Sequence, residues 1–171
     1  MNETRPLVEI VPMRAEDVDR VATLAGEIWR AHYPAIVSHA QIEYMLGERY
    51  NRRVMLDELQ RADLWWDVLL LAGEHTGFAS YFLTDEPGEM KLDKLYVHQQ
   101  HQRKGFGGLL IERCCKVARA QGCKQVILAV NKRNASAIAA YRKHGFDIAR
   151  SVVKDIGDGF VMDDFIMAKP L

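Results

Sequence analysis

The chain carries a basic, glycine-rich turn at residues 102–108, between a segment that alternates like a strand and one with helical spacing. The first turn of a helix leaves backbone N–H groups without partners and carries partial positive charge, so it can bind a phosphate or diphosphate. Gly105 and Gly107 have no Cβ to obstruct the approach, and Arg103 and Lys104 add cations. These residue types and their spacing predict a diphosphate-binding turn.

Two well-known phosphate-binding patterns do not fit this turn. The phosphate loop G-x-x-x-x-G-K-[ST] is absent, and G-x-G-x-x-G fails because Leu110 stands where the third glycine belongs. The residues match Gln/Arg-x-x-Gly-x-Gly/Ala instead, from Gln102 to Gly107, after a strand that ends in Leu-Tyr-Val. Taken alone, the turn also fits a tight bend that binds no ligand.

A second block, at residues 134–146, has the pattern Asn-x-x-Ala-x-x-x-Tyr-x-x-x-Gly-Phe, with its first residue at Asn134 and its tyrosine at Tyr141. With both blocks in this order, the chain resembles the GNAT acetyltransferase superfamily. The motifs carry this resemblance over residues 92–146 only. It implies an N-acetyltransferase that passes an acetyl group from acetyl-CoA directly to a primary amine of a small molecule.

The resemblance also implies which residues bind acetyl-CoA. In the family, the first motif holds the diphosphate, and the pantetheine arm lies between the splayed ends of two parallel strands. A backbone N–H of the first strand would also polarise the thioester carbonyl, as in an oxyanion hole. The implied donor-binding residues are Leu95, Tyr96, Val97, Gln102, Arg103, Lys104, Gly105, Phe106, Gly107, Gly108, Asn134, Ala137 and Tyr141.

Tyr141 is the predicted general acid, which protonates the departing thiolate of coenzyme A. A phenol, with a reference pKa of about 10, keeps its proton at neutral pH and can still give it to sulfur. The alternative is that Tyr141 is a core aromatic residue on an amphipathic helix. For Asn134, the sequence predicts an N-cap as well as a donor-binding residue.

The general base that takes the proton of the amine is left open by the sequence. Strict alternation places Leu92, Lys94 and Tyr96 on one face of their strand, and Asp93, Leu95 and Val97 on the other. Asp93 is the first candidate on that basis, although strand carboxylates are usually solvated or ion-paired. The other candidates are Glu89, His32 and His39.

The acceptor site is expected between the first and second strands, where the family varies. The predicted substrate-binding residues are Trp29, His32, Tyr33 and Tyr44. They suggest a partly aromatic cleft for a small amine, and core packing is the alternative. Acidic residues nearby would suit a cationic acceptor such as a polyamine, and a solvated face explains them equally well. The same two readings, contact with a cationic acceptor and a solvated acidic face, apply to Asp163 and Asp164 on the last strand.

The fold that must position these residues is predicted as α/β (α+β), with a GNAT-like, mostly antiparallel central sheet, helices on both faces and one splayed parallel strand pair. The predicted strands are residues 7–13, 65–72, 78–83, 92–97, 125–130, 146–155 and 160–168. The predicted helices run from Val18 to before Pro34, from His39 to near Gly47, over residues 53–62, from Phe106 to Gly122 and from Asn134 to Gly145. Short turns are predicted at residues 75–77 and 86–88.

Length and composition suit one domain over residues 1–171. Lys plus Arg and Asp plus Glu both number 23, and the zero net charge argues against nucleic-acid and membrane-surface partners. The sequence has no bilayer-spanning run and no signal pattern, which predicts a cytoplasmic protein. The three cysteines fit structural positions, and His98 and His101 have no third ligand, so no metal site is expected.

Two other functions remain open from the sequence. One is acetylation of a protein or peptide amine, and the other is a non-catalytic acyl-CoA-binding sensor. An intact Tyr141 counts against the sensor. The oligomeric state is open as well, although homodimers are common in the family.

Overall fold

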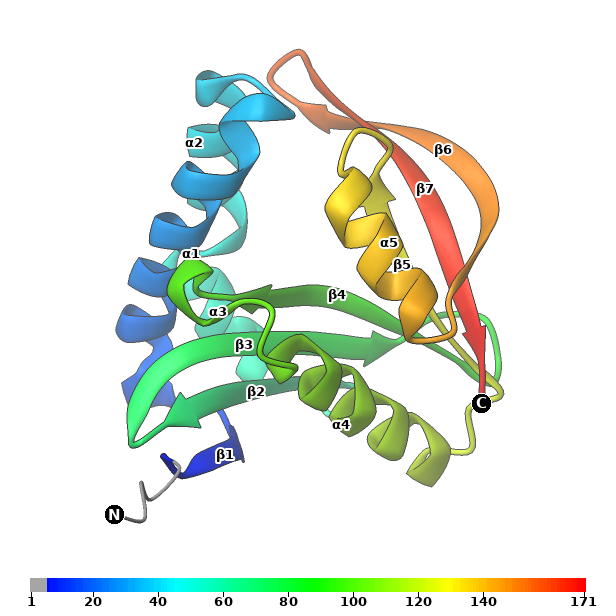
Figure 1. Ribbon diagram of the computed structural model, residues 1–171. Helices are drawn as coiled ribbons and strands as arrows, with labels where there is room; N and C mark the ends of the chain where they lie inside the picture. Colours follow the sequence, from blue (N-terminus) through cyan, green and yellow to red (C-terminus); the bar gives the residue numbers. More distant parts are fainter. Residues whose placement is uncertain (1–5) are drawn as a thin grey trace.

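A central sheet organises the computed structural model, which describes residues 6–171. Its strands are β1 (Val8–Pro12), β2 (Leu64–Leu71), β3 (Glu74–Leu83), β4 (Glu89–Val97), β5 (Gln125–Asn131), β6 (Asp147–Gly157) and β7 (Phe160–Pro170). Over residues 6–171 these form one seven-stranded sheet in the order β1-β2-β3-β4-β5-β7-β6 (Figure 1). Neighbouring strands are antiparallel except for β4 and β5, which are parallel. The mixed fold predicted from the sequence is confirmed.

Helices cover both faces of the sheet. They are α1 (Val18–His32), α2 (His39–Arg49), α3 (Arg52–Leu59), α4 (Phe106–Ala120) and α5 (Ala135–Lys143), with short 3-10 turns η1 (Ala15–Asp17), η2 (Tyr33–Ala35) and η3 (Gln99–His101). Helices α1, α2 and α3 bury their apolar sides on one face, which we call the α1–α3 core. Helices α4 and α5 lie on the other face and build the α4–α5 core (Figure 1).

Local sequence signals fix several helix ends. The Ser38 hydroxyl accepts a hydrogen bond from the backbone N–H of Gln41 at 3.2 Å and so caps the start of α2. The side chain of Asn51 caps α3 in the same way, through Val54 N at 2.9 Å. Helix α2 ends at Arg49, two residues beyond Gly47, and the Asn51 side chain donates a hydrogen bond to the carbonyl oxygen of Gly47 at 2.8 Å. Gly122 and Gly145 have positive φ after α4 and α5, as the sequence predicts.

The β2–β3 turn lies earlier than predicted. The residues with positive φ are Ala72 and Gly73, at 50° and 83°, and β3 already begins at Glu74. The prediction of a turn at residues 75–77 was therefore wrong. Gly77 serves a different purpose, because a Cβ at this position would lie 2.8 Å from the carbonyl oxygen of Tyr96. The glycine allows β4 to approach β3 closely.

A one-residue bulge in β4 changes which side chains share a face. Ser80 of β3 pairs with Lys94 and Tyr81 pairs with Leu92, so Asp93 is the extra residue. Leu92 therefore packs in the α4–α5 core with Val97, while Tyr96 packs on the α1–α3 core. The prediction that Leu92 shares a face with Tyr96, and Asp93 one with Leu95, was wrong. Strict alternation fails at the bulge because the extra residue shifts the parity.

The parallel strands β4 and β5 separate after a short contact. Their register runs from Glu89 opposite Gln125 to Lys91 opposite Ile127, and both strands then continue without pairing to each other. Figure 1 shows them diverging, with α4 below the gap and α5 above it. The side chain of Ala129, in the middle of the sheet, is exposed at this point. The predicted splayed pair is therefore present, and it opens a gap in the sheet.

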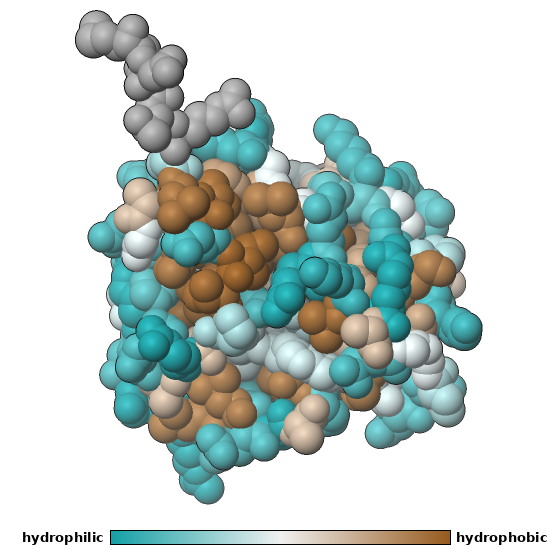
Figure 2. Space-filling view, turned by 90° about the horizontal axis from the view of Figure 1, so that it is seen from below, coloured by the Kyte–Doolittle hydropathy of each residue, from teal (hydrophilic) through white to brown (hydrophobic). Residues whose placement is uncertain are grey.

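The β1 edge of the sheet is less covered by helices than its centre. Helix α4 packs on β2, β3 and β4, and Val8 and Ile10 of β1 stay half-buried at the border of the α4–α5 core. The view from below shows apolar side chains gathered on this face of the molecule (Figure 2). Within residues 6–171, none of the helices has the length and hydrophobicity needed to span a bilayer.

Candidate active site

The turn predicted to bind a diphosphate lies where β4 leads into α4. The Gln102 side chain donates a hydrogen bond from Nε2 to the carbonyl oxygen of Val97 at 3.0 Å, which ties the turn to the end of the strand. Arg103 and Gly105 have positive φ, at 61° and 84°. This backbone conformation favours glycine at position 105, and it turns the chain directly into the first turn of α4.

The first turn of α4 presents free backbone donors. Its first helical hydrogen bond runs from Leu109 N to Gly105 O, and within residues 6–171 the N–H groups of Phe106, Gly107 and Gly108 have no acceptor. A Cβ at Gly105 or Gly107 would meet nothing within 4 Å, so the space beside these groups is open. The arrangement has the form of an anion-binding helix start.

Helix α5 closes the other side of this turn. A Cβ at Gly108 would lie 2.7 Å from Cε1 of His144, so the absence of a side chain lets the end of α5 approach α4. The exposed side chains of Arg103 and Lys104 extend from the turn into solvent. The structure therefore brings together the residues of the first motif and the end of the second.

Tyr141 lies on α5, at the border of the α4–α5 core. Its ring packs edge-on against Phe146, with ring centroids 5.9 Å apart. Burial, with a further contribution from Tyr33, raises the pKa of the Tyr141 phenol above its usual range. Among residues 6–171 its hydroxyl has no hydrogen-bond partner in the structure, so a protonated phenol is available to a ligand.

Asn134 links α5 to α1 rather than capping its own helix. It occupies the predicted N-cap position of α5, but its side chain makes no capping hydrogen bond there. Its Oδ1 instead lies 3.2 Å from Nε2 of His32 and 3.4 Å from the Ser136 hydroxyl. The residue is only 5% exposed. Its interaction with His32 joins the two sides of the gap.

An aromatic wall lines the α1–α3 side. Trp29 and Tyr33 pack at a centroid distance of 4.4 Å, and the hydroxyls of Tyr33 and Tyr96 lie 3.1 Å apart. Tyr50, which sequence reasoning missed, packs edge-on against Trp29. The signal for Tyr50 was weak, because it directly follows a helix and matches no motif.

Three of the four predicted substrate-binding residues come together, and the fourth does not. Trp29, His32 and Tyr33 belong to α1 and the turn that follows it. Tyr44 lies on α2 and points to the β6–β7 hairpin. Its hydroxyl donates a hydrogen bond to the carbonyl oxygen of Ile156 at 2.7 Å, and its ring packs on Phe160. This contact fastens α2 to the β6–β7 hairpin.

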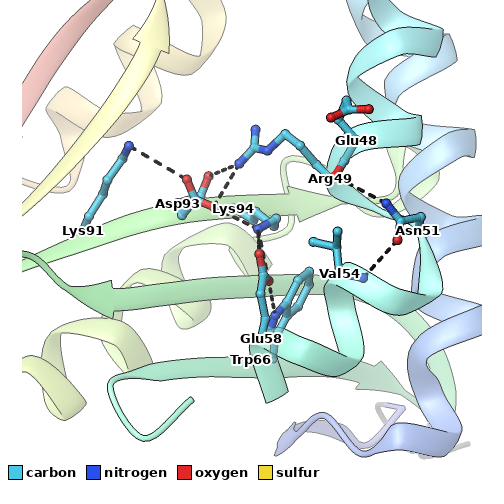
Figure 3. A network of polar contacts seen from close by, with 9 residues as sticks. All are labelled: Glu48, Arg49, Asn51, Val54, Glu58, Trp66, Lys91, Asp93 and Lys94. Atoms are coloured by element: carbon cyan, nitrogen blue, oxygen red, sulfur yellow. Dashed lines mark hydrogen bonds and ion pairs between the residues drawn. The ribbon is translucent and has the colours of Figure 1, made fainter. Parts of the chain in front are cut away.

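A network of charged side chains fills the α1–α3 side of β4 (Figure 3). The Asp93 carboxylate lies 2.9 Å from both the Arg49 guanidinium and the Lys94 ammonium, and 3.9 Å from the Lys91 ammonium. Lys94 is 2% exposed and also pairs with Glu58, whose carboxylate accepts a hydrogen bond from Trp66. The bulge allows the neighbouring residues Asp93 and Lys94 to meet on this face.

The network makes Asp93 a weak base. Burial alone would raise the pKa of Asp93, but Arg49 and Lys94 outweigh burial and hold the pKa well below its usual range. A carboxylate with a low pKa takes a proton from an amine poorly. Arg49 was missed because no sequence spacing shows that the end of α2 meets β4.

Comparison with known proteins gives the same picture as the geometry. The model of the Acetyltransferase (GNAT) family matches residues 24–146. A spermidine N(1)-acetyltransferase from Thermoplasma acidophilum is 27% identical over 164 residues, covering 95% of this chain and 96% of that protein. A spermine/spermidine N(1)-acetyltransferase from Bacillus subtilis is 27% identical over 118 residues, covering 64% and 75%. The crystal structure of PaiA N-acetyltransferase from Thermoplasma acidophilum in complex with coenzyme A superposes with a TM-score of 0.83 at 25% identity, covering 96% and 99%.

Proposed function

The chain belongs to the GNAT acetyltransferase family, and we propose that it transfers an acetyl group from acetyl-CoA directly to a primary amine of a small molecule. The observation that carries the proposal is the set of free N–H groups at the start of α4, next to the gap between β4 and β5. Two relatives are spermidine or spermine acetyltransferases, and a related structure contains coenzyme A. Polyamines are therefore the first acceptors to test.

The donor would be held by both motifs. The backbone of Phe106, Gly107 and Gly108, assisted by Arg103 and Lys104, would bind its diphosphate. The unpaired end of β4, at Leu95, Tyr96 and Val97, offers backbone groups to the pantetheine arm and an N–H to the thioester carbonyl. Ala137 and Asn134 of the second motif line the opposite side of the gap in this proposal. Bound there, acetyl-CoA supplies the activated acetyl group.

Tyr141 provides the acid in this mechanism. As the amine nitrogen bonds to the carbonyl carbon, the carbon–sulfur bond breaks and the sulfur takes the Tyr141 proton. The phenolate regains a proton from solvent, and the nitrogen loses its extra proton to a base. Asp93 remains the predicted base, although its ion pairs with Arg49 and Lys94 count against that role. Water is the alternative acceptor of this proton.

The two rival functions use the same donor site. A protein or peptide acetyltransferase needs an open acceptor surface, whereas this gap is bordered by half-buried and buried aromatic side chains such as Trp29, Tyr33 and Tyr96. A non-catalytic sensor would need no acid, and the unpartnered hydroxyl of Tyr141 argues against that reading. The cytoplasmic location and any homodimer stay predictions.

A thiol-release assay decides between these functions. Wild-type protein and acetyl-CoA are combined with spermidine, spermine, other small amines, amino acids and a lysine-containing peptide, and acetylated products are identified by mass spectrometry. The proposal predicts thiol release with at least one small amine and much less with the peptide. A preference for the peptide would support the protein acetyltransferase. Coenzyme A binding without turnover of any amine would support the sensor.

A further inference from the structure

One carboxylate near the gap lacks the partner that a buried charge requires. Asp164 of β7 is 8% exposed, and its Oδ1 is fully buried without a hydrogen-bond partner among residues 6–171. No cation of the described residues lies within ion-pair distance of either oxygen. Burial raises the pKa of this carboxyl above its usual range, although Lys91 lowers it. An unpaired buried carboxylate is costly, so such a group in a native protein needs an explanation, and a bound cation or a catalytic role is one.

The strand geometry places Asp164 on the acceptor side of the sheet. Phe165 and Met167 of β7 pack into the α4–α5 core, whereas Met162 packs on the α1–α3 core. Because side chains alternate along a strand, Asp164 faces the same side as Met162. Its charge contributes to the raised pKa of Tyr33, and Tyr33 contributes to that of Tyr141. Asp164 thus lies on the face of the sheet that also carries the aromatic wall.

The cations near Asp164 are committed to another carboxylate. Arg49 lies 2.9 Å from Asp93, and Lys91 lies 3.9 Å from it. Asp163, the next residue on β7, contrasts with Asp164 because it is exposed and pairs with Lys132 at 2.6 Å. The two aspartates therefore differ both in exposure and in ion pairing. Asp163 has a cation partner, and Asp164 has none among residues 6–171.

The face of the sheet that carries Asp164 is partly exposed on the neighbouring strand β5. The partner of Asp164 on β5 is Asn131, and Ala129, two residues before Asn131, is exposed. Because paired residues on neighbouring strands point to the same face, Ala129, Asn131 and Asp164 share one face of the sheet. The exposed side chain of Ala129 shows that this face is open to a small ligand on β5, the strand that pairs with Asp164 and borders the gap.

We propose that Asp164 binds an ammonium group of the acceptor, and that the enzyme therefore selects acceptors with a second, charged amine. The inference rests on the proposed function. The reacting amine must be neutral to attack the thioester, so the ammonium held by a carboxylate is the amine that does not react. A diamine or polyamine has this chemistry, and a simple monoamine does not.

The test compares two acceptors of equal length, 1,4-diaminobutane and butylamine, with spermidine as a longer polyamine. For each, kcat/KM is measured by thiol release with wild type, Asp164→Asn and Asp163→Asn. Wild type should prefer the diamine by between about 10-fold and 100-fold, as expected for a hydrogen bond to a charged group. Asp164→Asn should reduce this preference to near unity through a higher KM, and Asp163→Asn should preserve it.

The other outcomes separate the inference from the function on which it rests. A wild type that acetylates both amines equally well, or an Asp164→Asn variant that keeps the preference, overturns the role of Asp164 and leaves the function intact. Absence of thiol release with every amine overturns the function itself. A melting temperature for Asp164→Asn equal to or above that of wild type, with unchanged coenzyme A affinity, excludes a structural explanation, and a large drop would favour one.

Discussion

Replacement of Tyr141 by phenylalanine isolates the proposed acid from the fold around it. The hydroxyl has no hydrogen-bond partner among residues 6–171, so its removal breaks no internal contact, and the ring keeps its packing against Phe146. We expect the free energy of unfolding to change by less than about 0.5 kcal/mol, as for substitutions away from packed or hydrogen-bonded features. The affinity for coenzyme A should also be unchanged.

The rate should respond strongly, because loss of a positioned acid typically costs 10² to 10⁴ in rate. That factor corresponds to about 3 to 5 kcal/mol in activation free energy. Burial raises the pKa of Tyr141, so its phenol keeps the proton to higher pH than a free tyrosine. Ionisation of this group should therefore not reduce the wild-type rate between about pH 6 and pH 9.

The assay measures kcat and KM for thiol release by wild type and Tyr141→Phe, with thermal melting and calorimetric titration of coenzyme A as controls. A fall in kcat at unchanged donor affinity and melting temperature supports the acid role. A variant whose kcat stays within twofold of wild type would refute it, and Tyr141 would then be a packing residue.

Three further predictions concern stability. Arg49→Met removes one of the cations on Asp93 and should lower the free energy of unfolding by about 2 to 4 kcal/mol in urea denaturation, less than a fully broken buried pair because Lys94 remains; an unchanged value would contradict the ion-pair account. The folded-state pKa of Asp93 is lowered, so its stabilising effect is present above the unfolded pKa of about 4 and is lost as the pH falls below it. Asp93→Asn should therefore weaken the decline in stability between about pH 5 and pH 2, and a decline identical to that of wild type would argue against the pair. Asn51→Ala removes the cap of α3 and should cost about 1 kcal/mol, or about 2 to 4 °C in Tm; no shift would mean that the cap contributes nothing.

The geometry of the proposed donor side could be predicted from the sequence because it is local. The glycines at 105 and 107 and the helix that follows define the free N–H groups within one turn of the chain. Tyr141 and Ala137 are one helical turn apart on α5, so their shared face also follows from spacing. No distant contact was needed to find these residues.

The acceptor side could not be predicted because it depends on contacts between distant segments. The bulge at Asp93 is defined by its register with β3, and the alternation of apolar residues along β4 does not reveal it. Tyr44 points to the β6–β7 hairpin because of where that hairpin docks on α2. The isolation of Asp164 likewise follows from the pairing of β7 with β5, which the sequence does not encode locally.

Calorimetric titration of coenzyme A into wild type, Gly107→Asn and Gly107→Asp tests the central claim, that the start of α4 binds the diphosphate of the donor. Both side chains fit the open space at Gly107, and aspartate should even stabilise the helix start. Two unit charges about 4 Å apart repel by about 4 kcal/mol near a protein surface, so Gly107→Asp should bind at least about 100-fold more weakly than Gly107→Asn. Wild-type protein that gives no heat of binding, or equal affinities for the two variants, would contradict the account.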